Sequence, residues 1–311
     1  MKMSKSLVGW ELHMRSGRYA TCTIKGYLQT MRKIVTFLND PDAADVTVWD
    51  LESYLSKRRD DGVSESTRQT EWKVIKAYYK WASMKKGLGI PRPDTELEMP
   101  RTADPEIQPY TKDEIMKLLR ACKMTRPAKT EKRESWTYLR KTAFRDQLII
   151  LILLDTGVRV SELCRIQYKD LNLSTQSIHI RSFESGLKSR DRLVYLGDTT
   201  MDILWKITVE NEDPENYLIP SSISKRNRPM DRYAIGHLLR SLGEKAGVPH
   251  VGAHRFRHTF AVEYLRNGGD IYTLKRQLGH NSLAMVQRYL ALSETDAQKA
   301  HRKASPVDNW C

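Results

Sequence analysis

Residues suited to phosphate chemistry occur in three short segments, and the first is Thr156–Leu163. It reads T-G-V-R-V-S-E-L and follows an apolar run. Gly157 permits a tight turn after a buried helix, and we expect Ser161 to cap the short helix that follows. Arg159 then stands next to Glu162, where its planar guanidinium can donate to two phosphate oxygens. A surface ion pair between these two side chains is the alternative explanation.

The second segment, His254–Phe260, reads H-R-F-R-H-T-F. On a helix, His254 and Arg257 share one face, whereas the two phenylalanines point to another. A basic cluster that aromatic side chains anchor in the core is better explained as an anion site than as solvated surface. We interpret Arg255 and His258 as structural or surface groups.

The third segment is Leu278–Ser282, which reads L-G-H-N-S and is followed by Tyr289. Gly279 is expected to end one helix, and Ser282 to cap the next, on which Tyr289 lies. His280 stands between the two helices. A lone tyrosine on a helix usually packs in a core or an interface, so only the ordered set of partners suggests chemistry for this one.

Together these segments resemble the tyrosine recombinase (phage integrase) family, and the similarity covers residues 111–290. The helical region before them is similar to the core-binding domain of that family. Because we expect no arm-binding domain ahead of this region, the chain is most similar to the compact Xer-type members. The matching positions are Arg159, His254, Arg257, His280 and Tyr289.

The resemblance implies that Tyr289 attacks a DNA phosphodiester, forms a 3′-phosphotyrosyl intermediate and releases a 5′-hydroxyl. Arg159 and Arg257 would clamp the non-bridging oxygens of the transition state. His254 would hydrogen-bond the phosphate or accept the tyrosine proton. His280 would donate a further hydrogen bond to the phosphate.

Two further residues complete the site that the resemblance implies. Glu162 would orient Arg159 and His254. The family also has a hairpin lysine that protonates the departing 5′-oxygen, and Lys188 is the only lysine in Glu184–Arg192. A solvated lysine at the tip of the hairpin is the alternative. Since two guanidiniums supply the charge that metals provide in other nucleases, we expect no metal, no cofactor and no ATP.

Composition agrees with a DNA-binding protein without requiring one. The chain has 311 residues and 52 Lys+Arg against 38 Asp+Glu, a formal net charge of +14. The longest apolar run, Leu148–Leu154, is far shorter than the roughly 20 residues that span a bilayer, and no secretory signal precedes it. The cysteines are scattered singly, which predicts reduced thiols in a cytoplasmic protein rather than a zinc site or a disulfide framework. They are Cys22, Cys122, Cys164 and Cys311.

Periodicity and prolines divide the chain into two expected domains. Residues 1–99 read as a helical, SAM-like core-binding domain with about four helices and no strand. Capping residues are expected at Thr47 and Ser66. Residues 100–109 form a proline-rich linker, and 110–311 the catalytic domain. The expected fold is mainly α, with a small antiparallel sheet in the catalytic domain.

Within the catalytic domain, Ser177–Phe183 and Arg192–Leu196 are expected to pair as strands across a turn. A capping box at Thr111 is expected to open the domain. The stretch Lys123–Lys141 is polar, and its pattern favours no element.

The sequence thus predicts a site-specific recombinase that cleaves and rejoins duplex DNA at inverted-repeat-like core sites. A homotetramer on DNA, or assembly with a partner recombinase, is implied by the family, as are possible accessory proteins. A type IB topoisomerase uses similar chemistry and is one alternative. A DNA-binding protein with a relic active site is the other.

Overall fold

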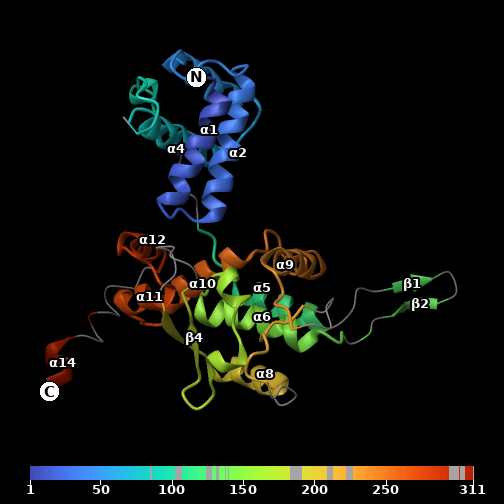
Figure 1. The fold of residues 1–311 in the computed structure, drawn as a ribbon. Coiled ribbons are helices and arrows are strands. Elements are labelled where there is room, and N and C mark those ends of the chain that lie inside the picture. Colours follow the sequence, from blue (N-terminus) through green and yellow to red (C-terminus); the bar gives the residue numbers. More distant parts are fainter. Residues whose placement is uncertain are drawn as a thin grey trace. The chain divides into compact units, whose positions relative to one another are not determined.

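The computed structural model describes most of the chain as a largely helical protein with little sheet (Figure 1). Contacts divide it into one compact unit over Met1–Pro105 and a second over Glu106–Phe183 and Leu187–Cys311. The described residues are all except 85, 102–106, 124–127, 131–132, 137, 139, 183–190, 209–212, 222–226, 294–300, 302–304 and 311.

The first unit is a bundle of four α-helices, and no strand occurs among its described residues. Its core is built from the apolar faces of these helices, with Trp10, Tyr78 and Tyr79 among the largest buried side chains. The helices are α1 (Met3–Ser16), α2 (Thr21–Phe37), α3 (Val48–Asp60) and α4 (Glu65–Ala82), followed by the short 3-10 turn η1 (Pro93–Thr95).

The start of α3 follows local capping chemistry. Thr47 caps α3 through a reciprocal box in which its hydroxyl accepts from the Asp50 backbone N–H and the Asp50 carboxylate accepts from the Thr47 N–H. The cap expected at Ser66 is wrong, because α4 begins earlier, at Glu65, with Ser64 as its N-cap. Ser66 therefore lies inside the first turn of the helix.

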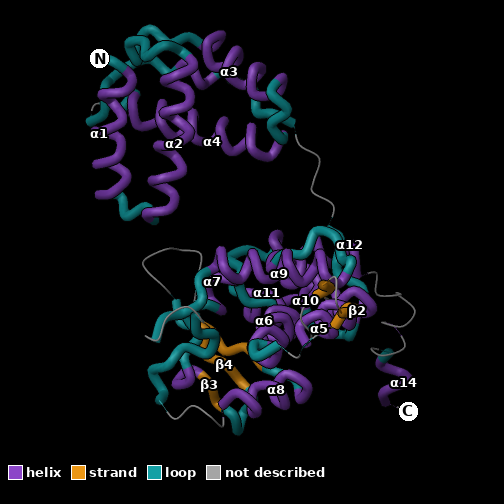
Figure 2. The backbone as a smooth tube through the Cα atoms, turned by 90° about the vertical axis from the view of Figure 1, so that its right-hand side faces the viewer, coloured by secondary structure: helices purple, strands orange, loops and turns teal. Residues whose placement is uncertain are grey.

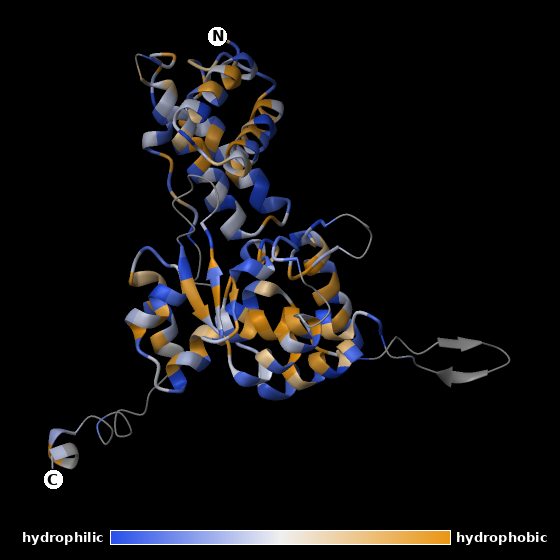
Figure 3. Cartoon of the chain, turned by 60° about the horizontal axis from the view of Figure 1, so that its bottom comes forward, coloured by the Kyte–Doolittle hydropathy of each residue, from blue (hydrophilic) through white to orange (hydrophobic). Residues whose placement is uncertain are grey.

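The second unit is organised around α6 (Ala143–Thr156), which is buried along most of its length. Helix α6 packs against α5, α8 and α10, and it lies in the middle of the second unit in Figure 2. Apolar residues gather on these inner elements in Figure 3, with polar ones toward the edge of the unit. The other helices are α5 (Lys112–Lys123), α7 (Val160–Leu163), η2 (Tyr168–Asp170), α8 (Asp198–Thr208), α9 (Arg232–Ala246), α10 (Ala253–Arg266), α11 (Ile271–Leu278), α12 (Ala284–Ser293) and α14 (Pro306–Trp310).

A three-stranded antiparallel sheet in this unit has the order β3-β4-β5. The two expected strands are observed in shorter form, and the preceding strand was not predicted because it has only two residues. In the polar stretch that favoured no element, two short strands pair as an antiparallel hairpin. The strands are β1 (Ala128–Thr130), β2 (Arg133–Trp136), β3 (Leu171–Asn172), β4 (Ser177–Ile180) and β5 (Arg192–Tyr195).

A second, smaller core joins α10, α11 and α12. Phe260, Leu278 and Val286 belong to it, and so does Tyr289, which is 2 % exposed. These three helices contact one another pairwise, so residues separated by more than twenty positions meet in one place.

Among the described residues, no helix combines the length and hydropathy needed to cross a bilayer. These described residues also contain no group of three His, Cys, Asp or Glu side chains that could hold a metal ion. Cys22, Cys122 and Cys164 are free thiols, and Cys311 lies outside the described residues.

Candidate active site

The turn after α6 places Arg159 as expected, although the cap differs from the prediction. Gly157 adopts the left-handed conformation, with φ of 61°, and ends the helix. Arg159, rather than Ser161, is the N-cap of α7, and its backbone N–H donates to the Glu162 carboxylate over 2.8 Å. The Arg159 guanidinium also donates to Glu162, over 3.1 Å, and its side chain is 30 % exposed.

Glu162 is buried between two arginines. Arg192, at the start of β5, donates to both carboxylate oxygens over 3.1 and 2.7 Å. Burial acts to raise the pKa of Glu162, but the hydrogen bonds and charge of Arg192, followed by those of Arg159, lower it to about 2. Glu162 is therefore ionised and holds Arg159 in place. Its predicted action on His254 stays a prediction.

Arg192 was given no role from the sequence, yet it joins three segments of the site. Besides Glu162, its Nε donates to the Gln277 carbonyl at the end of α11 over 2.6 Å. A Cβ atom on Gly279 would come within 3.2 Å of the Arg192 guanidinium, so glycine leaves room for it. The turn with Arg159, strand β5 and the end of α11 are thus held together by one side chain.

Arg257 lies on α10 and is almost completely buried, at 2 % exposure. Its guanidinium donates to the Gly157 and Leu278 carbonyls over 2.6 and 2.7 Å, and to His280 Nε2 over 2.7 Å. Burial, followed by repulsion from Arg159, lowers the pKa of Arg257 to about 9, which leaves it charged at neutral pH. A positive charge is therefore held in a fixed position inside the unit.

His280 directly follows Gly279, which ends α11 in the left-handed conformation as predicted. Burial, followed by repulsion from Arg257, lowers the pKa of His280 to about 3, so its ring is neutral. Because a guanidinium can only donate, His280 Nε2 must accept from Arg257, and the ring proton lies on Nδ1. Among the described residues, this buried Nδ1 has no hydrogen-bond partner.

His254 is the second residue of α10 and is accessible to solvent. Desolvation by the surrounding protein, followed by repulsion from Arg257, lowers its pKa. Arg255, interpreted from the sequence as structural, forms an ion pair with Glu114 over 3.0 Å. Lys188 lies outside the described residues.

Tyr289 lies on α12, and its hydroxyl is joined to His258 Nδ1 by a hydrogen bond of 2.9 Å. Burial raises the pKa of Tyr289, while Arg257 and Arg288 act in the opposite direction. His258 is half-buried and bonded to Tyr289, so it is not a surface group, and its interpretation as a structural group stays a prediction. Its position directly after Arg257 was the one available signal, but a contact across 31 positions leaves no trace in the spacing.

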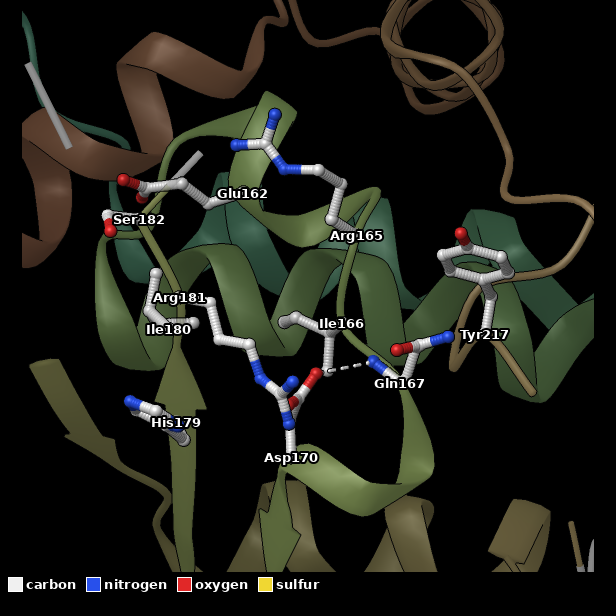
Figure 4. A pocket seen from close by; sticks show the side chains of 10 residues that line it. All are labelled: Glu162, Arg165, Ile166, Gln167, Asp170, His179, Ile180, Arg181, Ser182 and Tyr217. Carbon is white, nitrogen blue, oxygen red and sulfur yellow. Dashed lines mark hydrogen bonds and ion pairs between the residues drawn. The ribbon is translucent and has the colours of Figure 1, made fainter. Parts of the chain in front are cut away.

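A separate pocket of about 230 Å³ has Glu162 in its lining (Figure 4). Arg181 and Asp170 point toward each other in it and form an ion pair of 2.6 Å. Neither Arg257 nor Tyr289 lines this pocket. The phosphate-binding candidates therefore lie at a different surface, where α7, α10 and α11 end or begin.

Comparison with known proteins agrees with this fold. The model of the phage integrase family matches residues 110–296, and that of the phage integrase N-terminal SAM-like domain matches residues 7–86. The chain belongs to the phage integrase family. It is a tyrosine site-specific recombinase, an enzyme that breaks and rejoins DNA strands.

Similar relatives include Xer-type recombinases. The chain is 26 % identical to tyrosine recombinase XerA of Thermococcus kodakarensis, over 92 % of this chain and 90 % of that protein. It is 25 % identical to tyrosine recombinase XerC of Bacillus pumilus, over 93 % and 92 %. A structure of the Tn1549 transposon integrase in complex with transposon right end DNA shares the fold, with a TM-score of 0.75 and 19 % identity over 98 % of this chain and 99 % of that one.

Proposed function

We propose that Tyr289 is the nucleophile and that the buried ring of His280 marks the phosphate site. The observation that supports this most directly is His280 Nδ1, a buried donor without a partner among the described residues. An unpaired buried donor costs about 1–3 kcal/mol, which a bound phosphate oxygen would recover. Arg257, 2.7 Å from the same ring, supplies the positive charge that this oxygen needs.

Arg159 and Arg257 act as the clamp on the non-bridging oxygens. Arg257 is fixed by two backbone carbonyls, and Arg159 by the ionised Glu162. Donors held in this way need no reorganisation when charge develops in the transition state. Two guanidiniums then provide the electrostatic stabilisation, and the phosphotyrosyl bond conserves the energy of the phosphodiester, so the proposed reaction uses neither a metal ion nor ATP.

His254 hydrogen-bonds the phosphate from the exposed start of α10. Lys188 protonates the departing 5′-oxygen, by the family resemblance alone. Together these groups let the Tyr289 hydroxyl displace a 5′-hydroxyl and form a 3′-phosphotyrosyl bond, which the 5′-hydroxyl of a partner strand then resolves.

The proposed substrate is duplex DNA with inverted-repeat-like core sites, bound by a helical core-binding domain (residues 1–99) and a catalytic domain (110–311) on either side of the linker 100–109. The net charge of +14 favours a polyanion. We infer a homotetramer, or assembly with a partner recombinase, and accessory proteins, as in the family. We assign the enzyme to the cytoplasm, because it acts on DNA and its scattered cysteines suit a reducing compartment.

Covalent trapping tests this proposal. Fragmented DNA from the source organism is incubated with the protein in EDTA and quenched with detergent, and the captured adducts are sequenced. We expect adducts at one recurrent site, and none with Tyr289→Phe, which removes the attacking oxygen. Tyr272→Phe is the matched control, because Tyr272 is 68 % exposed and lies at the end of α11 away from His280.

Adducts that persist in Tyr289→Phe would sink the assignment of the nucleophile. Adducts that form when EDTA is left out but not when it is present would instead contradict a metal-independent reaction.

A further inference from the structure

The contact between Tyr289 and His258 has no role in the mechanism described so far. Within the described residues, the Tyr289 hydroxyl has one hydrogen-bond partner, His258 Nδ1 at 2.9 Å. The two ring centroids lie 5.6 Å apart. This distance between hydroxyl and ring nitrogen is within the reach required of a proton acceptor.

The groups around His258 keep its ring neutral. Burial is the largest effect, and His254, Arg288 and Arg257 add repulsion, which together lower the pKa of His258 to about 4. The pKa of Tyr289 is raised, so its hydroxyl is protonated at neutral pH. A protonated phenol thus faces a neutral imidazole.

We propose that His258, rather than His254, accepts the proton of Tyr289 when the tyrosine attacks DNA. This proposal rests on Tyr289 being the nucleophile. The Tyr289 O–H bond breaks and an N–H bond forms at His258 Nδ1. The phenolate lone pair forms the bond to phosphorus, the bond from phosphorus to the 5′-oxygen breaks, and that oxygen takes a proton from an ammonium group, assigned above to Lys188.

The position of His254 explains why it is the less suitable acceptor. His254 lies one helical turn before His258 on α10, with the ring centroids 4.2 Å apart and edge-to-face. No hydrogen bond joins His254 to Tyr289 among the described residues. His254 is accessible to solvent, whereas His258 is half-buried between it and the tyrosine. Of the two histidines, His258 is therefore the one in hydrogen-bond contact with the Tyr289 hydroxyl.

DNA binding makes His258 a stronger base. Its pKa is depressed partly by Arg257 and Arg288, and a phosphate between these arginines adds negative charge that offsets this repulsion. Because Tyr289 is 2 % exposed, its ring must turn outward to meet phosphorus. His258 directly follows Arg257 on α10. The proton acceptor therefore stays next to the arginine that binds the phosphate while the tyrosine ring moves.

Single-turnover cleavage of a nicked duplex that carries the captured site tests the proposal. Glutamine can still hydrogen-bond the tyrosine, but it cannot take up a proton. We expect His258→Gln to lower the cleavage rate by about 100-fold or more while DNA affinity stays unchanged. His237→Gln on α9 is the matched control, because His237 is exposed and outside the site.

A second duplex replaces the bridging 5′-oxygen with sulfur, which leaves as a thiolate and needs no proton. This duplex should rescue a variant that lacks the proton donor, Lys188→Ala, but not His258→Gln. If His258→Gln cleaves as fast as the wild type, or if sulfur restores its rate, His258 is not the acceptor. Both results would leave the nucleophile intact, since that assignment depends on Tyr289→Phe in the same assay.

Nitrogen NMR of histidine-labelled protein without DNA gives a test that does not depend on folding of His258→Gln. We expect His258 Nδ1 to carry no proton at pH 6–8, and its resonance to move in Tyr289→Phe. A proton on Nδ1 would overturn the proposal, because the ring would then donate to the tyrosine oxygen.

Discussion

At the scale of single residues, Glu162 is the buried anion that pairs with two arginines of the candidate site. Its carboxylate is shared between Arg159 and Arg192, and its side chain is 1 % exposed. A buried anion with two cationic partners is stabilising only while all three are ionised. Removal of its charge therefore takes one anionic partner from each of the two guanidiniums, which lie close enough to Arg257 to repel it.

We expect Glu162→Gln to lower the free energy of unfolding at pH 7 by up to roughly 3 kcal/mol, from a carboxyl pKa that folding lowers from 4.5 to about 2. A lowered folded-state pKa stabilises the protein above the unfolded pKa. The difference between the variant and the wild type should therefore shrink as the pH falls from about 4.5 toward 2. Urea unfolding at several pH values measures it, and a difference that is the same at pH 7 and pH 3 would contradict this origin.

At the scale of elements, the end of α6 is the point where the site is assembled. The Gly157 carbonyl accepts from Arg257 of α10. A Cβ atom at Gly157 would lie 2.4 Å from a Phe260 ring carbon and 2.8 Å from a Leu278 methyl group. Three helices thus approach one glycine, whose φ of 61° also disfavours any side chain.

Gly157→Ala should therefore cost about 2 kcal/mol or more in stability, through backbone strain and overpacking, and should displace Arg257. Gly236 on α9 provides the control, because a Cβ there meets nothing within 4 Å. Gly236→Ala should stabilise the helix by about 0.5–1 kcal/mol. Thermal unfolding compares the two, and equal effects of both substitutions would show that the close packing at Gly157 has no energetic consequence.

At the scale of the whole molecule, each unit has a hydrophobic core of its own. The core of the first unit is formed by residues between Met3 and Leu97, and the cores of the second by residues from Tyr110 onward. A unit that buries its own apolar surface needs no partner to fold.

We predict that residues 1–101 alone unfold cooperatively when heated, as followed by circular dichroism. Ile75, which is 0 % exposed, gives the control. Ile75→Ala in this fragment should lower its stability by about 2–5 kcal/mol. A fragment without a cooperative transition would mean that the first unit depends on the rest of the chain.

Local rules account for what the sequence predicted correctly. Helical periodicity and caps such as Thr47 and Gly279 act over a few positions, so the four helices of the first unit and the helix ends at Gly157 and Gly279 were predicted correctly. Two expected caps, Ser66 and Ser161, were wrong because a neighbouring residue took the N-cap position. The hairpin within Lys123–Lys141 was not predicted, since its polar residues lack the alternation that indicates strands.

The site was predictable only where a motif resembled a known family. His258 and Arg192 were not predicted as site residues, because what links them to the candidate site is tertiary contacts with Tyr289 and Glu162. Such contacts depend on how α10 packs on α12 and how β5 meets α7. No spacing within a single segment carries that information.

The burial of Tyr289, the nucleophile that we propose, has a consequence for how often the enzyme would cut an incorrect sequence. If the hydroxyl is exposed for only a small fraction of the time, the cleavage rate during each encounter with DNA is only that fraction of its maximum. Random duplex, which is bound briefly, would then be left intact on most visits. A complete DNA target that binds the protein for longer, or that stabilises the Tyr289 ring in its outward position, would restore the cleavage rate. Selectivity for the correct sequence would thus be set partly by dwell time, in addition to any contact with the bases.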